Sequence, residues 1–221
     1  VERTAAIAGF LASLGVKAMV VAGNTATAIA VNVLRQTWDL PVVGIEPGIK
    51  PAVERTATKR IVVLATQRTI ESDAVRDLRD RFGGEVQIIL QACPGLVEQV
   101  ECGDLDSERT RDLLRKYTQA LRDRAADVLV LGCTHYAFLE SQLRNIVGDD
   151  VIIIEPSRAV ARQLDARLSD AGLHNDAATA GADYFYTSAN DPTPVSAGIS
   201  KLLDTEITAV RMDNGAKRRM P

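Results

Sequence analysis

The chain of 221 residues has few cysteines and no marked excess of charge of either sign. Its three cysteines, Cys93, Cys102 and Cys133, include no Cys-x-x-Cys pair. Such a sparse, odd set argues against a disulfide framework or a zinc site, and it favours a reducing, cytoplasmic setting. The formal net charge is −3, so the chain lacks the excess of positive charge that is typical of proteins binding nucleic acid or an anionic membrane surface. We therefore expect a small-molecule partner.

Long hydrophobic runs are also missing. No apolar stretch approaches the length of a membrane span, and no charged-then-apolar leader opens the sequence. Apolar residues make up 46% and charged residues 25% of the chain, as in an ordinary soluble globular protein. We expect no membrane partner.

Short apolar runs alternate with amphipathic segments along the chain. Continuous Val/Ile/Leu strands between helices indicate strands buried on both faces of a mostly parallel sheet. The predicted fold class is α/β, with doubly wound sheets. Helical spacing covers 3–14, 25–36, 49–58, 70–81, 107–124, 136–147, 157–170 and 195–203, and strand-like runs cover 18–22, 42–45, 61–66, 86–90, 128–132, 151–154, 183–187 and 207–212.

Two pairs of motifs repeat at nearly one spacing. Gly23-Asn24-Thr25 and Cys133-Thr134-His135 each follow a strand-like run, and Ile-Glu-Pro occurs at 45–47 and 154–156. The offsets are 133 − 23 = 110 and 154 − 45 = 109. Two pairs held at one spacing indicate two related halves that build one site.

The repeat predicts two pseudo-symmetric domains, 1–57 plus 158–221 and 58–157. Two strand-like runs, 61–66 and 86–90, precede Cys133, whereas 22 residues precede Gly23 and the sequence opens on Val1 rather than Met. We therefore expect the first domain to lack its N-terminal strands, and the chain to be a fragment. The tail from 183 to 212 has no counterpart in the other half and is expected to pack on the first domain.

Polar residues follow the strand ends at both repeats. Asn24, Thr25 and Thr134 supply donors suited to a carboxylate or phosphate beside a helix N-terminus. Asn and Thr also serve as simple helix caps, an alternative that the duplication disfavours. A helix dipole at Cys133 would favour its thiolate, and His135 is near enough in sequence to exchange a proton. The alternative for Cys133 is a buried small apolar residue, as expected of Cys93.

Taken together, these motifs resemble glutamate racemase. The resemblance rests on Gly132-Cys133-Thr134-His135-Tyr136, Ala22-Gly23-Asn24-Thr25-Ala26, Ile45-Glu46-Pro47-Gly48, Cys93-Pro94 with Val100-Glu101, and Phe185-Tyr186-Thr187. It implies a cytoplasmic, homodimeric enzyme without a cofactor or metal that interconverts L- and D-glutamate for peptidoglycan synthesis. Two cysteines on opposite faces of the substrate would remove and return the α-proton.

The resemblance also implies individual roles. Cys133 matches the acid/base that acts on the L-enantiomer, and Gly23 stands where the other cysteine belongs. His135 and Glu101 match groups that assist proton transfer. The implied substrate-binding residues are Asn24, Thr25, Thr134 and His135, with Thr66, Thr69 and Ser72 from a threonine-rich loop.

Two departures from the family pattern bear on activity. Gly23 carries no proton acceptor, and the family's Asp-Ser-Gly and Pro-Tyr-Gly loops are expected upstream of Val1. Loss of a positioned base costs about a hundredfold to ten-thousandfold in rate, so we expect little or no racemisation. Gly23→Cys alone would not restore activity if the loops also matter.

Two alternatives remain open. Arylmalonate-type decarboxylases also carry one thiol, since decarboxylation generates its own carbanion and requires only a proton donor. A non-catalytic, glutamate-binding protein is the other. The basic run Lys217-Arg218-Arg219 is interpreted as a solvated terminus.

Overall fold

The computed structural model describes residues 1–175 and 181–212. The helices are α1 (Glu2–Ser13), α2 (Asn24–Thr37), α3 (Ile49–Arg55), α4 (Gln67–Ile70), α5 (Asp73–Phe82), α6 (Leu96–Glu101), α7 (Glu108–Asp123), the 3-10 helix η1 (Thr134–Leu139), α8 (Glu140–Val147), α9 (Ser157–Asp170) and α10 (Thr193–Leu203). The strands are β1 (Met19–Val21), β2 (Val42–Gly44), β3 (Arg60–Ala65), β4 (Gln87–Ala92), β5 (Val128–Leu131), β6 (Ile152–Ile154), β7 (Phe185–Thr187) and β8 (Ala209–Arg211).

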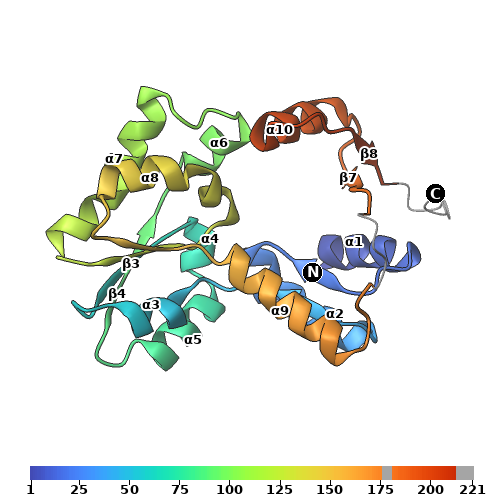
Figure 1. Cartoon of the computed structure of the whole chain (residues 1–221), viewed down its shortest axis with the longest axis horizontal. Coiled ribbons are helices and arrows are strands. Elements are labelled where there is room, and N and C mark those ends of the chain that lie inside the picture. Colours follow the sequence, from blue (N-terminus) through green and yellow to red (C-terminus); the bar gives the residue numbers. More distant parts are fainter. Residues whose placement is uncertain (176–180, 213–221) are drawn as a thin grey trace.

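The larger sheet has four parallel strands in the order β4-β3-β5-β6. Helices α7 and α8 lie on one face, and α3 and α5 lie on the other (Figure 1). Alternate side chains of a strand point to opposite faces. Leu64 and Leu129 therefore enter the core beneath α7 and α8, whereas Val63 and Val130 enter the core beneath α3. The predicted α/β class is confirmed.

A smaller sheet pairs β1 with β2, also in parallel. β1 ends before Gly23 as β5 ends before Cys133, and β2 and β6 follow in the same relation. Helix α2 packs on this sheet through Leu34, which is 1% exposed and lies in one core cluster with Met19, Val21 and Val42. Within residues 1–175 and 181–212, nothing in this sheet corresponds to β3 and β4. The pseudo-symmetric arrangement matches the sequence repeat.

The tail forms a third sheet, in which β7 and β8 are parallel. The Tyr186 ring meets Phe10 of α1 edge-on, with the ring centroids 5.0 Å apart, as expected of a tail that packs on the first half. Helix α10 also reaches α6 in the other half, which the sequence did not indicate (Figure 1). The basic run at 217–219 lies outside the described residues.

The connection between α3 and β3 is fastened to the larger sheet by Asp127, which precedes β5. Its carboxylate accepts from Thr56 Oγ1 at 2.5 Å, Ala57 N at 2.7 Å, Thr58 N at 3.1 Å and Thr58 Oγ1 at 2.8 Å. Partial burial raises the pKa of Asp127, but these hydrogen bonds outweigh it, and the pKa lies below its ordinary value.

Three helical regions differ in kind from the expected ones. The helix expected over 136–147 begins as the 3-10 helix η1 and is α-helical only from Glu140. The helix expected over 70–81 is divided into α4 and α5, because Thr66 and Ser72 each cap the start of a helix. Helix α6, which carries Glu101, was not expected from the sequence. None of the helices in the described ranges combines the length and hydrophobicity that a bilayer crossing requires.

Candidate active site

The two repeated motifs face each other where β1 and β5 end. Gly23 precedes α2 with φ −132° and ψ 123°, and Cys133 precedes η1 with φ −136° and ψ 134°. Asn24 Nδ2 donates to the Gly132 carbonyl at 2.9 Å, so the first motif directly contacts the second. Strand ends of parallel sheets are the usual place for a ligand.

Cys133 is half-buried, and its Sγ lies 3.7 Å from His135 Nδ1. Burial raises the pKa of Cys133, and the Glu101 carboxylate raises it further. The main-chain N–H groups of His135 and Tyr136 act in the opposite direction but do not prevail. The expected thiolate-stabilising effect of a helix N-terminus is thus outweighed here, because η1 is a short 3-10 helix and desolvation dominates.

Glu101 extends this row of groups to the surface. Its Oε1 lies 3.4 Å from His135 Nε2, and its side chain is 64% exposed. Cys133, His135 and Glu101 therefore form a continuous path from a half-buried thiol to solvent. Such a path can carry a proton, since imidazole accepts on one nitrogen while it donates from the other.

Threonine hydroxyls from both halves meet near the ends of β1 and β3. Thr66 Oγ1 lies 2.9 Å from Thr69 Oγ1, which lies 3.4 Å from Thr25 Oγ1. Thr134 is half-buried at the first position of η1. Ser72 instead caps α5, where its hydroxyl accepts from Val75 N.

Asn24 is 8% exposed and has one oxygen without a partner. Nδ2 is bonded to Gly132, while Oδ1 has no hydrogen bond with the described residues. A buried acceptor left unpaired costs about 1–3 kcal/mol. An ammonium or amide donor of a ligand would remove that cost.

Gly23 has room for a side chain. A Cβ built there would meet only Ala26 Cβ, at 3.7 Å, which is an ordinary contact. A Cβ at Gly132 would instead lie 2.9 Å from the carbonyl oxygen of Leu64. Glycine is thus sterically required beside Cys133 but not at position 23.

The other two cysteines lie in contrasting surroundings. Cys93 is 2% exposed, and burial raises its pKa to about 12. This environment fits the expected small apolar role of Cys93. Cys102 is exposed at the end of α6.

The Ile-Glu-Pro pair lines a different part of the molecule. A cavity of about 870 Å³ is lined by Glu46 and Pro47 from one repeat and by Glu155 and Pro156 from the other. Neither Cys133 nor His135 is in its lining. The second pair of motifs thus lines a cavity of its own, and this cavity too is built from both repeats.

Comparisons with known proteins identify the family of the chain. The family model described as Asp/Glu/Hydantoin racemase matches residues 2–164. Glutamate racemase from Methylococcus capsulatus is 49% identical over 187 residues, which cover 85% of this chain and 69% of the relative. Glutamate racemase from Ralstonia pickettii is 41% identical over 214 residues, covering 97% and 75%.

Solved structures give the same result. A glutamate racemase isoform from Bacillus anthracis superposes with a TM-score of 0.84 at 28% identity, covering 96% of this chain and 79% of that one. The Escherichia coli glutamate racemase, solved with L-glutamate and the activator UDP-MurNAc-Ala, gives a TM-score of 0.80 at 29% identity and covers 96% and 80%. The chain belongs to the aspartate/glutamate/hydantoin racemase family, and these relatives are glutamate racemases.

Proposed function

We propose that this chain binds glutamate beside Cys133 and exchanges the α-proton of one enantiomer with little or no racemisation. The observation that carries the proposal is the matched pair of strand ends. Gly23 and Cys133 share one backbone conformation, but only Cys133 bears an acid/base. Names of relatives support the substrate, since they are glutamate racemases at up to 49% identity.

The proposed substrate contacts are made by the buried amide oxygen of Asn24 and by the threonine hydroxyls of the site. Asn24 Oδ1 accepts from the substrate ammonium, which satisfies its buried lone pair. The hydroxyls of Thr25, Thr66, Thr69 and Thr134 donate to the two carboxylates of glutamate. Because these groups come from both halves, the ligand would lie between the two motifs.

The proposed proton transfer runs through Cys133. Because the pKa of Cys133 is raised, its thiol first passes its proton to His135 Nδ1, 3.7 Å away, while His135 gives up a proton from Nε2 to Glu101. The thiolate then takes the α-proton of glutamate. The thiol exchanges this proton with solvent through His135 and Glu101 and returns a solvent-derived proton to the same face. On the opposite face Gly23 offers no donor, so inversion loses about a hundredfold to ten-thousandfold in rate.

The test is an exchange assay in deuterated water with each enantiomer of glutamate supplied separately. We expect deuterium at Cα of L-glutamate with retention of configuration and little in D-glutamate, as read by mass spectrometry and chiral chromatography. Gly23→Cys should extend exchange to both enantiomers and yield inverted product, provided that the loops expected upstream of Val1 are not also required. This change of stereochemical pattern is informative even if the absolute rates are low.

Two matched cysteine variants serve as controls for that assay. Cys133→Ser should abolish exchange, and Cys102→Ser should leave it unchanged because Cys102 is exposed on the outer end of α6. Enzyme-like conversion of L- to D-glutamate by the unaltered chain would refute the single-face proposal. Glutamate binding without exchange would favour a non-catalytic binding protein.

We also propose that the chain forms a homodimer, as the resemblance implies. Ile29 and Val33, one turn apart on α2, are 57% and 40% exposed, so this helix presents an apolar stripe to a partner. Sedimentation velocity should show a dimer, and Ile29→Lys should shift it toward monomer. A monomeric parent chain at micromolar concentration would contradict the proposal.

A further inference from the structure

Helix α10 spans the two halves of the molecule close to Glu101. On one side α10 is hydrogen-bonded to β8 and to the residue pair that precedes it. Ala209 N donates to Ser196 Oγ at 2.9 Å, and Ile207 N donates to Ser200 Oγ at 2.8 Å. Through β7 this unit rests on α1, where Tyr186 meets Phe10. At the other side α10 lies against α6 (Figure 1).

The contact between α10 and α6 is made by one face of α10. A Cβ at Gly198 would lie 3.8 Å from the carbonyl oxygen of Glu101, so the two backbones approach closely there. One turn further, Lys201 Nζ donates to the carbonyl oxygen of Cys102 at 3.3 Å. Leu202 packs on the core of the larger sheet. These three positions, spaced i, i+3 and i+4, share one side of the helix.

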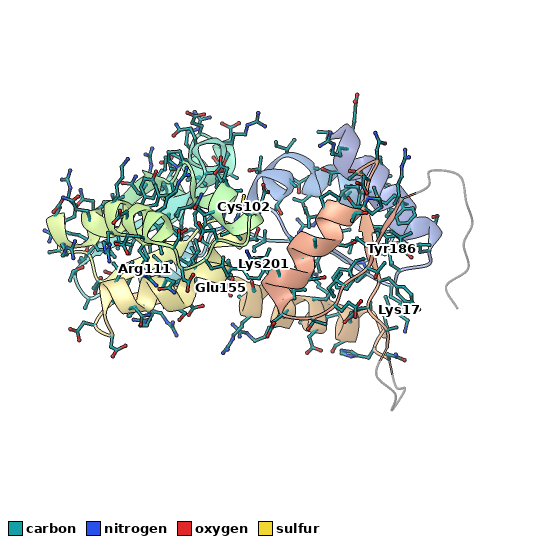
Figure 2. The ribbon with its side chains drawn as sticks, turned by 90° about the horizontal axis from the view of Figure 1, so that it is seen from above. Lys17, Cys102, Arg111, Glu155, Tyr186 and Lys201 are labelled. Carbon is teal, nitrogen blue, oxygen red and sulfur yellow. The ribbon has the colours of Figure 1, made fainter. Side chains whose placement is uncertain are left out.

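Lys201 completes the hydrogen bonding at the end of α6. Gly103, at φ +66°, reverses the chain, and its N–H bonds the Val100 carbonyl at 2.8 Å while Asp104 N bonds the Gln99 carbonyl at 2.8 Å. The Cys102 carbonyl accepts a hydrogen bond from Lys201 instead. The aliphatic part of the Lys201 side chain lies over Gly103, where a Cβ on Gly103 would be 2.4 Å from Lys201 Cδ. Figure 2 shows Lys201 beside Cys102, where the halves meet.

We propose that Lys201 is a positioning residue, which holds the end of α6 so that Glu101 stays within reach of His135. Glu101 is the last residue of a six-residue helix, and its carboxylate lies 3.4 Å from His135 Nε2 while its own side chain is largely exposed. Few contacts of Glu101 itself therefore fix it, and the neighbouring carbonyl of Cys102 offers the anchor. The proposal rests on the proposed role of Cys133, because the effect is read through that thiol.

The first readout is glutamate exchange in a double-mutant cycle. Lys201→Met, which keeps the stem and removes the ammonium, should lower the maximal exchange rate about tenfold at unchanged KM, because small misplacements of a catalytic group are costly. Lys201→Arg should recover most of that loss. Combined with Glu101→Gln, Lys201→Met should cause no further decrease, since both changes remove one interaction.

The second readout does not depend on turnover. In a Cys102→Ser background, the iodoacetamide alkylation rate of Cys133 should rise about twofold or more in Glu101→Gln, because the negative charge of Glu101 disfavours the thiolate. Lys201→Met should raise it by a similar factor. This arm remains valid if the parent chain does not exchange glutamate, so failure of the proposed function and failure of this proposal are distinguishable.

Lys17 provides the matched control. Its Nζ donates to the Leu173 carbonyl at 3.4 Å, a lysine-to-carbonyl contact like that of Lys201, and it lies far from Cys102 in Figure 2. Lys17→Met should change neither exchange nor alkylation. The proposal is overturned if Lys201→Met leaves Cys133 alkylation at the parent rate, if its effect on exchange multiplies with that of Glu101→Gln, or if Lys17→Met has the same effect.

Discussion

At the residue scale, two glycines next to the same site have opposite requirements. The backbone at Gly23 is extended and its Cβ direction is open, whereas Gly132 abuts the Leu64 carbonyl. Gly23→Ala should stabilise the chain by about 0.4–1 kcal/mol, because alanine restricts the unfolded state. Gly132→Ala should destabilise it by about 1–3 kcal/mol, as overpacking does.

Urea denaturation of both alanine variants measures this difference. The slope of the unfolding free energy with urea should stay constant, so that the shift in midpoint reports stability alone. Equal effects of the two substitutions would contradict the assignment of Gly23 as a position that tolerates a side chain.

The three cysteines should react with iodoacetamide in a fixed order. Exposed Cys102 should react first, and half-buried Cys133 more slowly, with a rate that rises as pH increases toward its raised pKa. Cys93, whose pKa is raised to about 12 by burial, should react only after unfolding. Peptide mapping by mass spectrometry at several times gives the order, and early labelling of Cys93 would be inconsistent with its 2% exposure.

The residue types at the site could be read from the sequence, but their energetics could not. Repetition of Gly23-Asn24-Thr25 and Cys133-Thr134-His135 identified the two strand ends. The raised pKa of Cys133 depends on burial, and the unpaired Oδ1 of Asn24 depends on a bond to a carbonyl 108 positions away. Main-chain groups and burial of this kind leave no trace in the local pattern.

At the element scale, Asp127 fixes the connection between α3 and β3 through hydrogen bonds to residues 56–58. Because the pKa of Asp127 is lower in the folded state than in the unfolded chain, its stabilisation is present above about pH 4 and is lost as pH falls through the folded-state pKa. Asp127→Asn should therefore cost about 1–3 kcal/mol at neutral pH and progressively less in acid.

Chemical denaturation of Asp127→Asn and the parent at about pH 7 and about pH 3 tests the sign of this effect. The difference in unfolding free energy should shrink at the lower pH. A difference that stays constant or grows in acid would show that the carboxylate is not the stabilising species.

Elements with strong periodicity were predicted more accurately than short ones. Helix α7 and the buried strands β3 and β5 follow the expected ranges closely, because each has a continuous apolar pattern. Helix α6 was missed, since its six residues, Leu96–Glu101, are too few for a periodic signal. Its position depends on tertiary contacts with η1 and α10, which lie distant in sequence.

At the scale of the whole molecule, stability should differ between the proposed domains, 58–157 and 1–57 plus 158–221. The larger sheet holds strands β3 and β5 at 0–1% exposure over 61–64 and 128–131, whereas α9 and α10 bury no residue fully. Hydrogen exchange by mass spectrometry should find β3 and β5 the most protected, with α9 and α10 exchanging earlier. Uniform protection across both sheets would argue for one cooperative unit.

The organisation into two related halves was predictable, because duplication places similar motifs at a constant spacing in the sequence. The placement of the tail could be predicted only in part from the sequence. The lack of a counterpart in the other half indicated that the tail packs on the first half, but the reach of α10 to α6 depends on a lysine contact with a main-chain carbonyl. A carbonyl acceptor has no residue signature, so a sequence pattern cannot specify such a contact.

The open Cβ direction at Gly23 has an evolutionary consequence. Two of the glycine codons differ from the cysteine codons only in the first base, so a single-nucleotide change interconverts the two residues. Since the backbone already has a conformation that cysteine adopts at the matching position, neither direction of that change meets a folding barrier. A change between glycine and cysteine at position 23 therefore requires one nucleotide and no rearrangement of this backbone.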